Sequence, residues 1–430
     1  MRRIQKICRE WGLLIVFVLL FSAPAWAQPA KVTGAIDAIS GDYHGVSKQI
    51  WEFREPGQEE VKSSALLMQE LKKLGYKVTG NLKVPDDLIK GGVAKTAFRA
   101  ELNGKGPGPT ITIMLEYDAL ANGHSCGHNL ISTSGLLAAA GLAKVMADTP
   151  GRVVVMGTPD EERGSTGMGK IALLEGGHFE GTDAVLTTHP GNRWSMDQRW
   201  LAQKRTFFTF KGKSAHAAAS PHKGINALRA ALLTINHIDM MREHLRQDVR
   251  IHAIVTKGGD RVNVVPELAQ IEVAVRALDT GTMEETFRKV VNCAKAAELV
   301  TGAKLEFKDP RVFLTSPIAV PAYVEMVRKN VLSQGLPPSE FKEIDELASS
   351  DLGAVGYIYP TVSLWFKASK EGISLHSDPF REAAATDEAW KSTVIAGKAL
   401  ALTAYELLNS PSKVKEIQET FKTMKEKEGK

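Results

Sequence analysis

The sequence has few cysteines, no strong excess of charge of one sign and no long apolar stretch beyond its N-terminus. Of three cysteines in 430 residues, Cys8 lies in an N-terminal leader-like segment, so Cys126 and Cys293 are the one pair that could form a disulfide in the remaining chain. The 54 basic residues against 49 acidic ones give a net charge of +5 without any concentrated basic patch, which offers no argument for nucleic-acid binding. Internal repeats and low-complexity tracts are also lacking. A chain of this length that is 43% hydrophobic is therefore expected to form two or three ordinary globular domains.

The first 27 residues have the order of a secretory signal. Arg2, Arg3, Lys6 and Arg9 precede an apolar run from Trp11 to Phe21, and Ala25-Trp26-Ala27 gives the small-residue pattern that signal peptidases cut. The apolar run is short for a membrane span, which needs about 20 residues. We therefore expect cleavage after Ala27 and a secreted or periplasmic product. Removing the four basic residues and Glu10, a net of +3, lowers the charge of the mature chain from +5 to +2.

Helix and strand patterns alternate in the first part of the mature chain and again near its end. Helical patterns cover 46–53, 61–74, 130–146, 169–175, 322–332, 387–408 and 411–430, and strand patterns cover 96–102, 110–115, 152–156, 183–188 and 361–366. Such alternation predicts a mostly parallel sheet with helices on both faces, an α/β catalytic domain. Between these two stretches the order is strand 205–211, helix 226–245, strands 249–256 and 269–277, helix 283–300 and strand 304–308. That order is typical of a ferredoxin-like α+β domain. We predict a discontinuous catalytic domain, 28–203 and 310–430, interrupted by an inserted domain, 204–309.

Cys126-Gly127-His128 is the first candidate site. In an extended segment, residues two apart point the same way, so the Cys126 thiolate and the His128 imidazole could reach one metal ion. Gly127 would let the backbone approach closely. Thiolate and imidazole suit zinc and its neighbours.

Three further polar sites follow predicted strands. Asp160-Glu161-Glu162 comes after strand 152–156, His189 follows strand 183–188, and His376 lies in a loop beyond strand 361–366. Because sites in open α/β sheets gather at the carboxyl ends of strands, we expect these residues to meet. The five candidate metal ligands, Cys126, His128, Glu162, His189 and His376, are too many for one tetrahedral structural zinc and enough for two metals with open positions.

Taken together, these motifs resemble metallopeptidase family 20, in the branch with hippurate hydrolase, p-aminobenzoyl-glutamate hydrolase and β-alanyl-lysine dipeptidase. The similar segments are Glu116-Tyr117-Asp118-Ala119-Leu120, Cys126-Gly127-His128-Asn129-Leu130, Gly157-Thr158-Pro159, Glu161-Glu162 and His189-Pro190. In the inserted region they are Gly212-Lys213-Ser214-Ala215-His216-Ala217-Ala218, Gly224-Ile225-Asn226-Ala227-Leu228 and Asn263-Val264-Val265-Pro266. They cover essentially the whole mature chain.

The resemblance implies a metal-dependent amidohydrolase or metallopeptidase. The five residues above would bind two divalent ions, zinc first, with manganese, cobalt or nickel as alternatives. Glu161 would be the general base toward a metal-activated water, and Asp118 would orient a ligand from behind. His216 would reach from the lid, the inserted dimerisation domain, to stabilise the oxyanion, in several relatives within the site of a dimer partner. Asn263 and Arg276 are candidate substrate contacts, the latter because guanidinium groups bind carboxylates in a bidentate manner.

Differences from the relatives at two places in the chain bear on the substrate. Ala121 stands where relatives usually carry proline, the loop to His124 is one residue shorter, and Arg163 follows the glutamate pair where relatives often have glycine. The ligands are unaffected, so we expect these changes to act on the entrance. Small N-acyl or aroyl amino acids are the first expected substrates, with dipeptidase or carboxypeptidase action on small peptides second.

Three alternatives remain open. The chain could be an exported metal- or peptide-binding protein on a decayed hydrolase scaffold, although a general base beside the ligands favours an enzyme. Cys126 could instead form a disulfide with Cys293. Cys126 and His128 could also act as a thiol hydrolase, which would leave the Glu161-Glu162 pair and the other histidines without a role.

Overall fold

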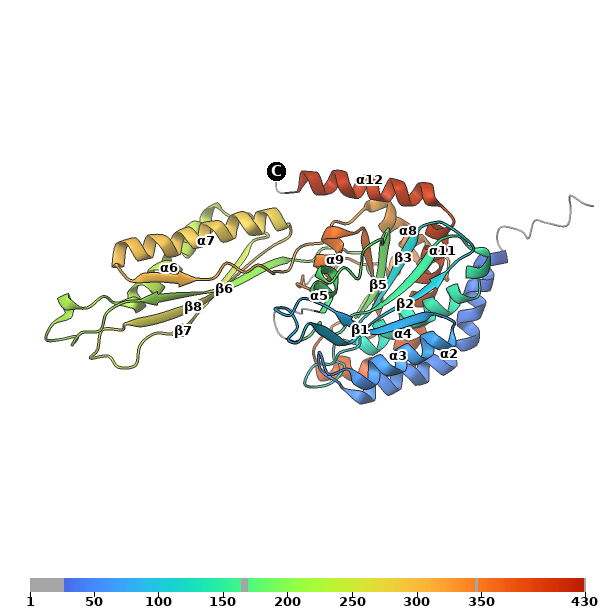
Figure 1. The fold of residues 1–430 in the computed structure, drawn as a ribbon, viewed down its shortest axis with the longest axis horizontal. Coiled ribbons are helices and arrows are strands. Elements are labelled where there is room, and N and C mark those ends of the chain that lie inside the picture. Colours follow the sequence, from blue (N-terminus) through green and yellow to red (C-terminus); the bar gives the residue numbers. More distant parts are fainter. Residues whose placement is uncertain (1–26, 164–168, 345–346, 429–430) are drawn as a thin grey trace, which may run out of the picture.

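The computed structural model describes residues 27–163, 169–344 and 347–428, and it forms a rounded α/β part joined to an elongated second part (Figure 1). The predicted signal, 1–27, lies outside the described residues except for Ala27, the first residue of the first helix. Within the described ranges, no helix combines the length and apolar character needed to span a membrane.

A six-stranded sheet forms the centre of the rounded part, which we call the body. The strand order is β1-β2-β4-β3-β5-β10. Strands β4, β3, β5 and β10 run parallel, whereas β1 and β2 add an antiparallel edge. The strands are β1 (Lys77–Lys83), β2 (Val93–Asn103), β3 (Thr110–Leu115), β4 (Arg152–Gly157), β5 (Ala184–Gly191) and β10 (Thr361–Lys367).

Helices cover both faces of this sheet, because the central strands are apolar on both sides. Ile111, Ile113 and Leu115 of β3 join the larger core, while Met114 joins the smaller one. The larger core also contains α2 (Ala27–Phe53), α3 (Val61–Lys73), α4 (His128–Ala143), α8 (Pro321–Leu332), α10 (Asp378–Ala383), α11 (Asp387–Leu408) and α12 (Pro411–Lys427). The smaller core lies under α5 (Gly169–Glu175) and α9 (Leu352–Ile358).

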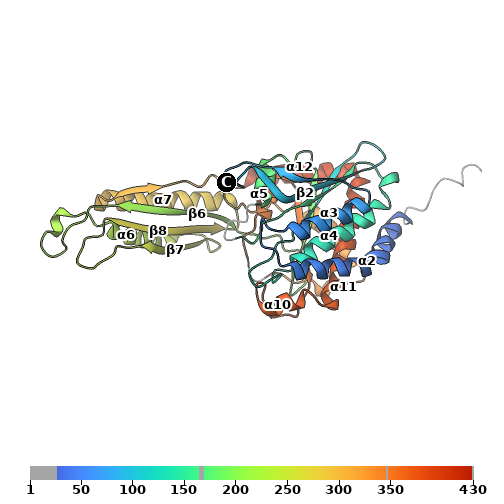
Figure 2. The ribbon, with the colours of Figure 1, turned by 60° about the horizontal axis from the view of Figure 1, so that its bottom comes forward.

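The second part, which we call the lid, is a four-stranded antiparallel sheet with two helices on one face (Figure 2). Its elements are β6 (Ala202–Lys211), α6 (Ala227–Met241), β7 (Arg250–Lys257), β8 (Leu268–Ala277), α7 (Thr280–Thr301) and β9 (Lys304–Phe307). The strand order β7-β8-β6-β9 is that of a ferredoxin-like fold. Phe207, Ile254 and Val255 remain exposed on its strands, so the lid carries apolar surface that the body does not cover.

The predicted fold class is confirmed. The bounds of strand 110–115, helix 169–175 and helix 387–408 agree with β3, α5 and α11. The antiparallel edge strand β1 and the short helices α9 and α10 were not predicted. The first helix begins at Ala27, earlier than the predicted residue 46, and β5 extends beyond the predicted end at residue 188 and includes His189.

Candidate metal centre

The candidate ligands gather at one edge of the body sheet, where the parallel strands β3, β4, β5 and β10 end. Glu116 and Asp118 follow β3, Glu161 and Glu162 follow β4, and His189 lies near the end of β5. The Thr158 amide and hydroxyl both donate to Leu115 O, at 2.8 and 2.9 Å, which keeps the segments after β3 and β4 together. The sheet topology thus explains why residues distant in sequence share one site.

His128 lies on the floor of the site with no exposed surface. Its Nδ1 is 2.8 Å from Asp118 Oδ1, and the second Asp118 oxygen accepts from the Glu162 amide at 2.7 Å. Asp118 thus holds two candidate ligands at once. With Nδ1 engaged by Asp118, the His128 Nε2 atom faces the site, where it has no hydrogen-bond partner among the described residues.

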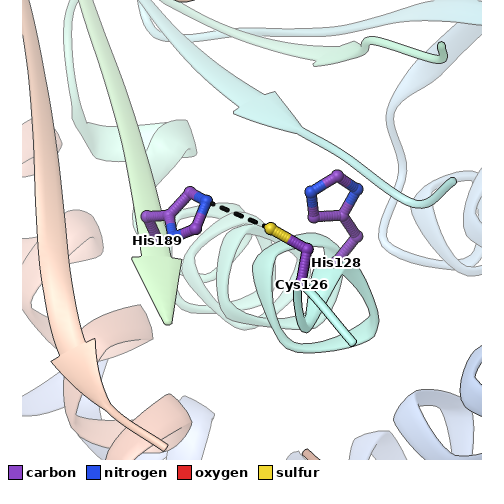
Figure 3. A group of neighbouring side chains, drawn as sticks. All are labelled: Cys126, His128 and His189. Carbon is purple, nitrogen blue, oxygen red and sulfur yellow. Dashed lines mark hydrogen bonds between the residues drawn. The ribbon is translucent and has the colours of Figure 1, made fainter. Parts of the chain in front are cut away.

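Cys126 and His128 are brought together by a turn, and the expected extended geometry is wrong. Gly127 has φ +76° and precedes α4, whose first residue is His128. This conformation favours glycine, and a Cβ at Gly127 would lie only 2.7 Å from Pro190 Cγ. The tight turn places the Cys126 sulfur 3.6 Å from His189 Nε2 (Figure 3).

His189 is prepared as a neutral ligand. Its Nδ1 is 2.8 Å from Pro190 O, which leaves Nε2 directed at Cys126. Burial lowers the pKa of His189 to about 4, so the imidazole is uncharged near neutral pH.

The ligand atoms form overlapping groups, each within 4.8 Å. One group is Cys126, His128 and His189, the second is Cys126, Glu162 and His376, and the third is His128, Glu161 and Glu162. The first two share the thiol. His376 Nε2 is 3.3 Å from Glu162 Oε1, and its side chain is 55% exposed whereas that of Glu162 is 8% exposed. The structure therefore places all five predicted ligands in one cluster.

The buried negative charges of the cluster favour the binding of cations. Burial lowers the pKa of His128, but Asp118, Glu116 and Glu162 outweigh it and raise the value to about 10. Burial and then the charge of Glu162 raise the pKa of the Cys126 thiol. Glu162 Oε1, like His128 Nε2, has no hydrogen-bond partner among the described residues. Buried carboxylates, a thiol and unpartnered ligand atoms are costly alone and would be compensated by bound divalent ions.

Glu161 lies in the group with His128 and Glu162 and also contacts a segment that the sequence analysis did not single out. The Ser350 hydroxyl donates to Glu161 Oε1 at 2.8 Å. Burial, followed by the charge of Glu116, raises the pKa of Glu161 well above its usual value. Because its raised pKa favours the protonated form, the Glu161 carboxylate can accept a proton from a water molecule and later donate it again.

A buried lysine supports this arrangement. Lys170 has no exposed surface, and its ammonium lies 2.9 Å from Glu116 Oε1 and also contacts Asp351, the neighbour of Ser350. The Lys170 amide donates to the second Asp351 oxygen at 2.9 Å. Lys170 thereby links Glu116, at the end of β3, to the segment of Ser350 and Asp351, whose Ser350 hydroxyl contacts Glu161. A lysine within an apolar helical pattern was the only sequence signal for it.

Glu60 holds the loop that carries the glutamate pair. This fully buried residue accepts from the Asp160 amide at 2.8 Å and from the Thr96 hydroxyl at 2.7 Å. Asp160 has φ +65°, a conformation that is uncommon for aspartate, and the Glu60 contact helps to maintain it. No sequence pattern indicated this role of Glu60.

A cavity of about 620 Å³ opens beside the cluster, at the junction of body and lid. Arg276 of β8 lines it, and Arg276 Nε has no hydrogen-bond partner among the described residues. Trp200 and Trp365 form an aromatic wall, with ring centroids 5.4 Å apart, and Trp365 also packs 4.3 Å from His189. Other lining residues are Cys126, Glu161, Glu162, Asn192, Arg193, Gln203, Leu314, Ile344, Ser350 and His376.

His216 and Asn263 are not brought to this cavity. Strand β6 begins beside the body and runs away from it, and both residues lie beyond its far end, where His216 bridges to Val264 and Asn263 O accepts from the Ala217 amide at 3.0 Å. Both are exposed. Neither lines the cavity of the same chain, so their expected contact with a substrate would require a second copy.

The two cysteine alternatives find no support in the geometry. Cys126 and Cys293 are both free, the former in the cluster and the latter on α7 of the lid. The Cys126 sulfur lies 3.6 Å from His189 Nε2, and among the described residues no hydrogen bond joins it to His128, the pair that the thiol-hydrolase alternative requires.

Comparison with known proteins points to one family. Residues 205–301 match the model of a peptidase dimerisation domain of M20 type. The chain is 30% identical over 406 residues to the Xaa-Arg dipeptidase of Mus musculus, covering 90% of each chain. It is 34% identical over 297 residues to one of the subunits of p-aminobenzoyl-glutamate hydrolase from Escherichia coli, covering 64% of this chain and 59% of that one.

A solved structure shares the fold at low sequence identity. It is the Bacillus subtilis YXEP protein, described as a dinuclear metal-binding peptidase from the M20 family, with a TM-score of 0.66 and 20% identity. The match covers 86% of this chain and 99% of that one.

Proposed function

Because this chain belongs to the M20 family of metal-dependent amidohydrolases and peptidases, we propose that it hydrolyses an amide bond in small N-acyl or aroyl amino acids. The observation that carries the proposal is the placement of Glu161 beside two ligand groups that share Cys126, at the mouth of one cavity. For the domains we propose 28–203 with 310–430 as the catalytic part and 204–309 as the lid.

The proposed cofactor is a pair of divalent ions held by Cys126, His128, Glu162, His189 and His376. Such ions supply Lewis-acid activation of an amide carbonyl and of a water molecule when bound. Thiolate and imidazole among the ligands favour zinc. His128 Nε2 and Glu162 Oε1, which have no hydrogen-bond partner among the described residues, fit this role most directly.

The protein's own residues divide the remaining work. Glu161, oriented by the Ser350 hydroxyl, takes a proton from the attacking water and delivers it to the leaving nitrogen. Asp118 fixes His128 with Nε2 toward the site. Arg276, whose pKa is lowered by burial and then by the charge of Arg205, offers a partly desolvated guanidinium to the substrate carboxylate.

The acyl group would lie against the aromatic wall. Trp200 and Trp365 offer flat apolar surface next to His189, which suits an aromatic acyl group. A second candidate function is dipeptide hydrolysis, favoured by the 30% identity to Xaa-Arg dipeptidase over 90% of both chains. Turnover of N-benzoyl amino acids against dipeptides, under matched conditions, decides between them. No turnover on either set would leave the metal- or peptide-binding alternative.

The test of the base assignment is Glu161→Gln. We expect the variant to keep its metal and lose turnover by about 10²–10⁴-fold, because general acid–base catalysis contributes on this order. Glu284→Gln, on the lid, is the matched control and should remain active. Near-normal turnover of Glu161→Gln would refute the assignment.

We also propose a homodimer formed through the lid. The peptidase dimerisation domain match covers the lid, and Phe207, Ile254 and Val255 are exposed on it. In such a dimer His216 and Asn263, which lie far from the cavity of their own chain, would complete the site of the other copy. The oligomeric state in solution, measured by light scattering, tests this.

The N-terminal pattern supports export. We propose that cleavage after Ala27 releases a secreted or periplasmic enzyme without a membrane anchor. N-terminal sequencing of the protein from its native host should begin at Gln28.

A further inference from the structure

The short loop Ala121–Gly123, where the chain differs from its relatives, does not line the cavity within the described residues. It contacts the segment that carries His376. We propose that Asn122 is a positioning residue that holds His376 in place as a metal ligand. This inference rests on the proposed metal centre and names one residue on which its second ligand group depends.

His376 needs outside support more than the other ligands do. Its side chain is 55% exposed, whereas His128 is fully buried. Its backbone has φ +64°, a left-handed conformation that is uncommon for any residue other than glycine. A ligand with little packing and an uncommon backbone conformation keeps its position only where neighbouring groups impose it.

The loop supplies this restraint on both sides of His376. The His376 amide donates to Ser125 O at 2.9 Å, and the Asn122 Nδ2 group donates to His376 O at 3.3 Å. Asn122 Oδ1 accepts from the Ser125 hydroxyl at 2.7 Å. Both peptide groups that flank the His376 Cα are therefore tied to the segment from Asn122 to Ser125.

The loop is itself anchored. Arg381 Nη1 donates to Asn122 O at 3.1 Å, and Asn122 Nδ2 makes a second hydrogen bond to Asp378 Oδ1 at 3.1 Å. Gly123 has φ +95°, and a Cβ there would lie 3.1 Å from Arg381 Cδ. These contacts fix Asn122 against α10 and leave it little freedom to follow a displaced His376.

The restraint acts on one ligand group more than on the other. Ser125 immediately precedes Cys126, so Asn122 fixes Cys126 and His376 relative to each other within the group Cys126, Glu162 and His376. His128 and His189 are held independently, by Asp118 and by Pro190 O. Loss of the Asn122 amide should therefore weaken one metal position selectively.

The experiment is zinc binding to metal-free protein by calorimetry, with Asn122→Ala. We expect the weaker of two binding steps to lose about 10–100-fold in affinity, the usual effect of removing a group that orients a metal ligand, while the tighter step changes little. Asn330→Ala removes an amide that bonds the Thr403 hydroxyl at 3.0 Å, away from the site, and should bind zinc as the unmodified protein does. Asn122→Asp, which keeps the acceptor for Ser125 but loses the amide donor, should resemble Asn122→Ala and replaces it if that variant does not fold.

His376→Ala separates the two possible failures. If His376→Ala loses the weaker step while both Asn122 variants bind zinc normally, the positioning role is wrong and the ligand set stands. If His376→Ala itself binds two ions with unchanged affinity, the proposed ligand set is wrong. Equal weakening of both steps by Asn122→Ala would also overturn the selective role.

Discussion

The body and the lid each bury a lysine, and the two environments differ. Lys170 of the body lies between the buried carboxylates of Glu116 and Asp351. Lys204 of the lid contacts Glu284 and Asp309, whose side chains are 28% and 66% exposed, and it lies 4.7 Å from the rings of both Phe287 and Phe313. In the body, the charges of Lys170, Glu116 and Asp351 are all buried and stabilise one another. In the lid, water can solvate Glu284 and Asp309 if Lys204 is lost.

The same contrast applies to the residues that bear chemistry. In the body they converge on one cavity, whereas His216 and Asn263 of the lid are exposed at its far end. The body should therefore bind metal by itself. His216 and Asn263 of the lid should contribute only when a second copy is present, whereas Arg276 of the lid lines the cavity of its own chain.

Replacing the two lysines gives the largest expected difference. Lys170→Met removes the ammonium that the buried carboxylates of Glu116 and Asp351 share, and should lower the free energy of unfolding by about 3–5 kcal/mol. Lys204→Met leaves exposed partners and places an apolar chain on two phenylalanines, so its cost should be about 1 kcal/mol or less. Chemical denaturation of metal-free protein measures both. An equal loss of unfolding free energy in the two variants would contradict the stronger mutual dependence of the charges in the body.

Lys170 also shows what the sequence could not provide. Its partners Glu116 and Asp351 lie 54 and 181 positions away, and no local pattern pairs them. Ser350 and Glu60 were missed for the same reason, because their roles arise only when distant loops meet Glu161 and Asp160. The metal ligands were predictable because they lie near or beyond the carboxyl ends of parallel strands, and topology alone brings such positions together.

His216 gives the next largest effect. Removal of one oxyanion donor costs about 10²–10³-fold in turnover, so His216→Ala should lose this much activity with unchanged metal content. Co-expressed with Glu161→Gln, it should recover about a quarter of normal activity, because half of randomly formed dimers would contain one intact site. No recovery in verified mixed dimers would show that His216 does not act across the dimer.

The smallest of these effects concerns pH and Glu60. Burial, followed by the charge of Asp118, raises the pKa of Glu60 from 4.5 to about 8. The native state therefore retains a proton that the unfolded chain releases, so this contribution to stability is full below pH 4.5 and is lost as pH rises through about 8. In metal-free protein, Glu60→Gln should remove this pH dependence, on the order of 2 kcal/mol between pH 5 and 9. Parallel stability curves for the two proteins would contradict the assignment.

The fold was more accessible from sequence than the details of the site. Helix and strand periods identified the parallel strands and the ferredoxin-like lid. Edge strand β1 was missed because its sequence, Lys77–Lys83, is polar and contains Gly80 and Asn81. The turn at Gly127 was read as an extended segment, since a single glycine does not reveal the sign of its φ. The proposed contact of His216 with a substrate requires a second chain, and one sequence does not show how two chains pack together.

The central claim is that one thiolate belongs to both metal positions. Equilibrium dialysis of the metal-free protein and of Cys126→Ser against zinc tests it most directly. The account predicts two ions per unmodified chain and weaker binding of both in Cys126→Ser, because the groups with His128 and His189 and with Glu162 and His376 share Cys126. Two ions bound with unchanged affinity by Cys126→Ser, or one ion or none bound by the unmodified chain, would contradict it.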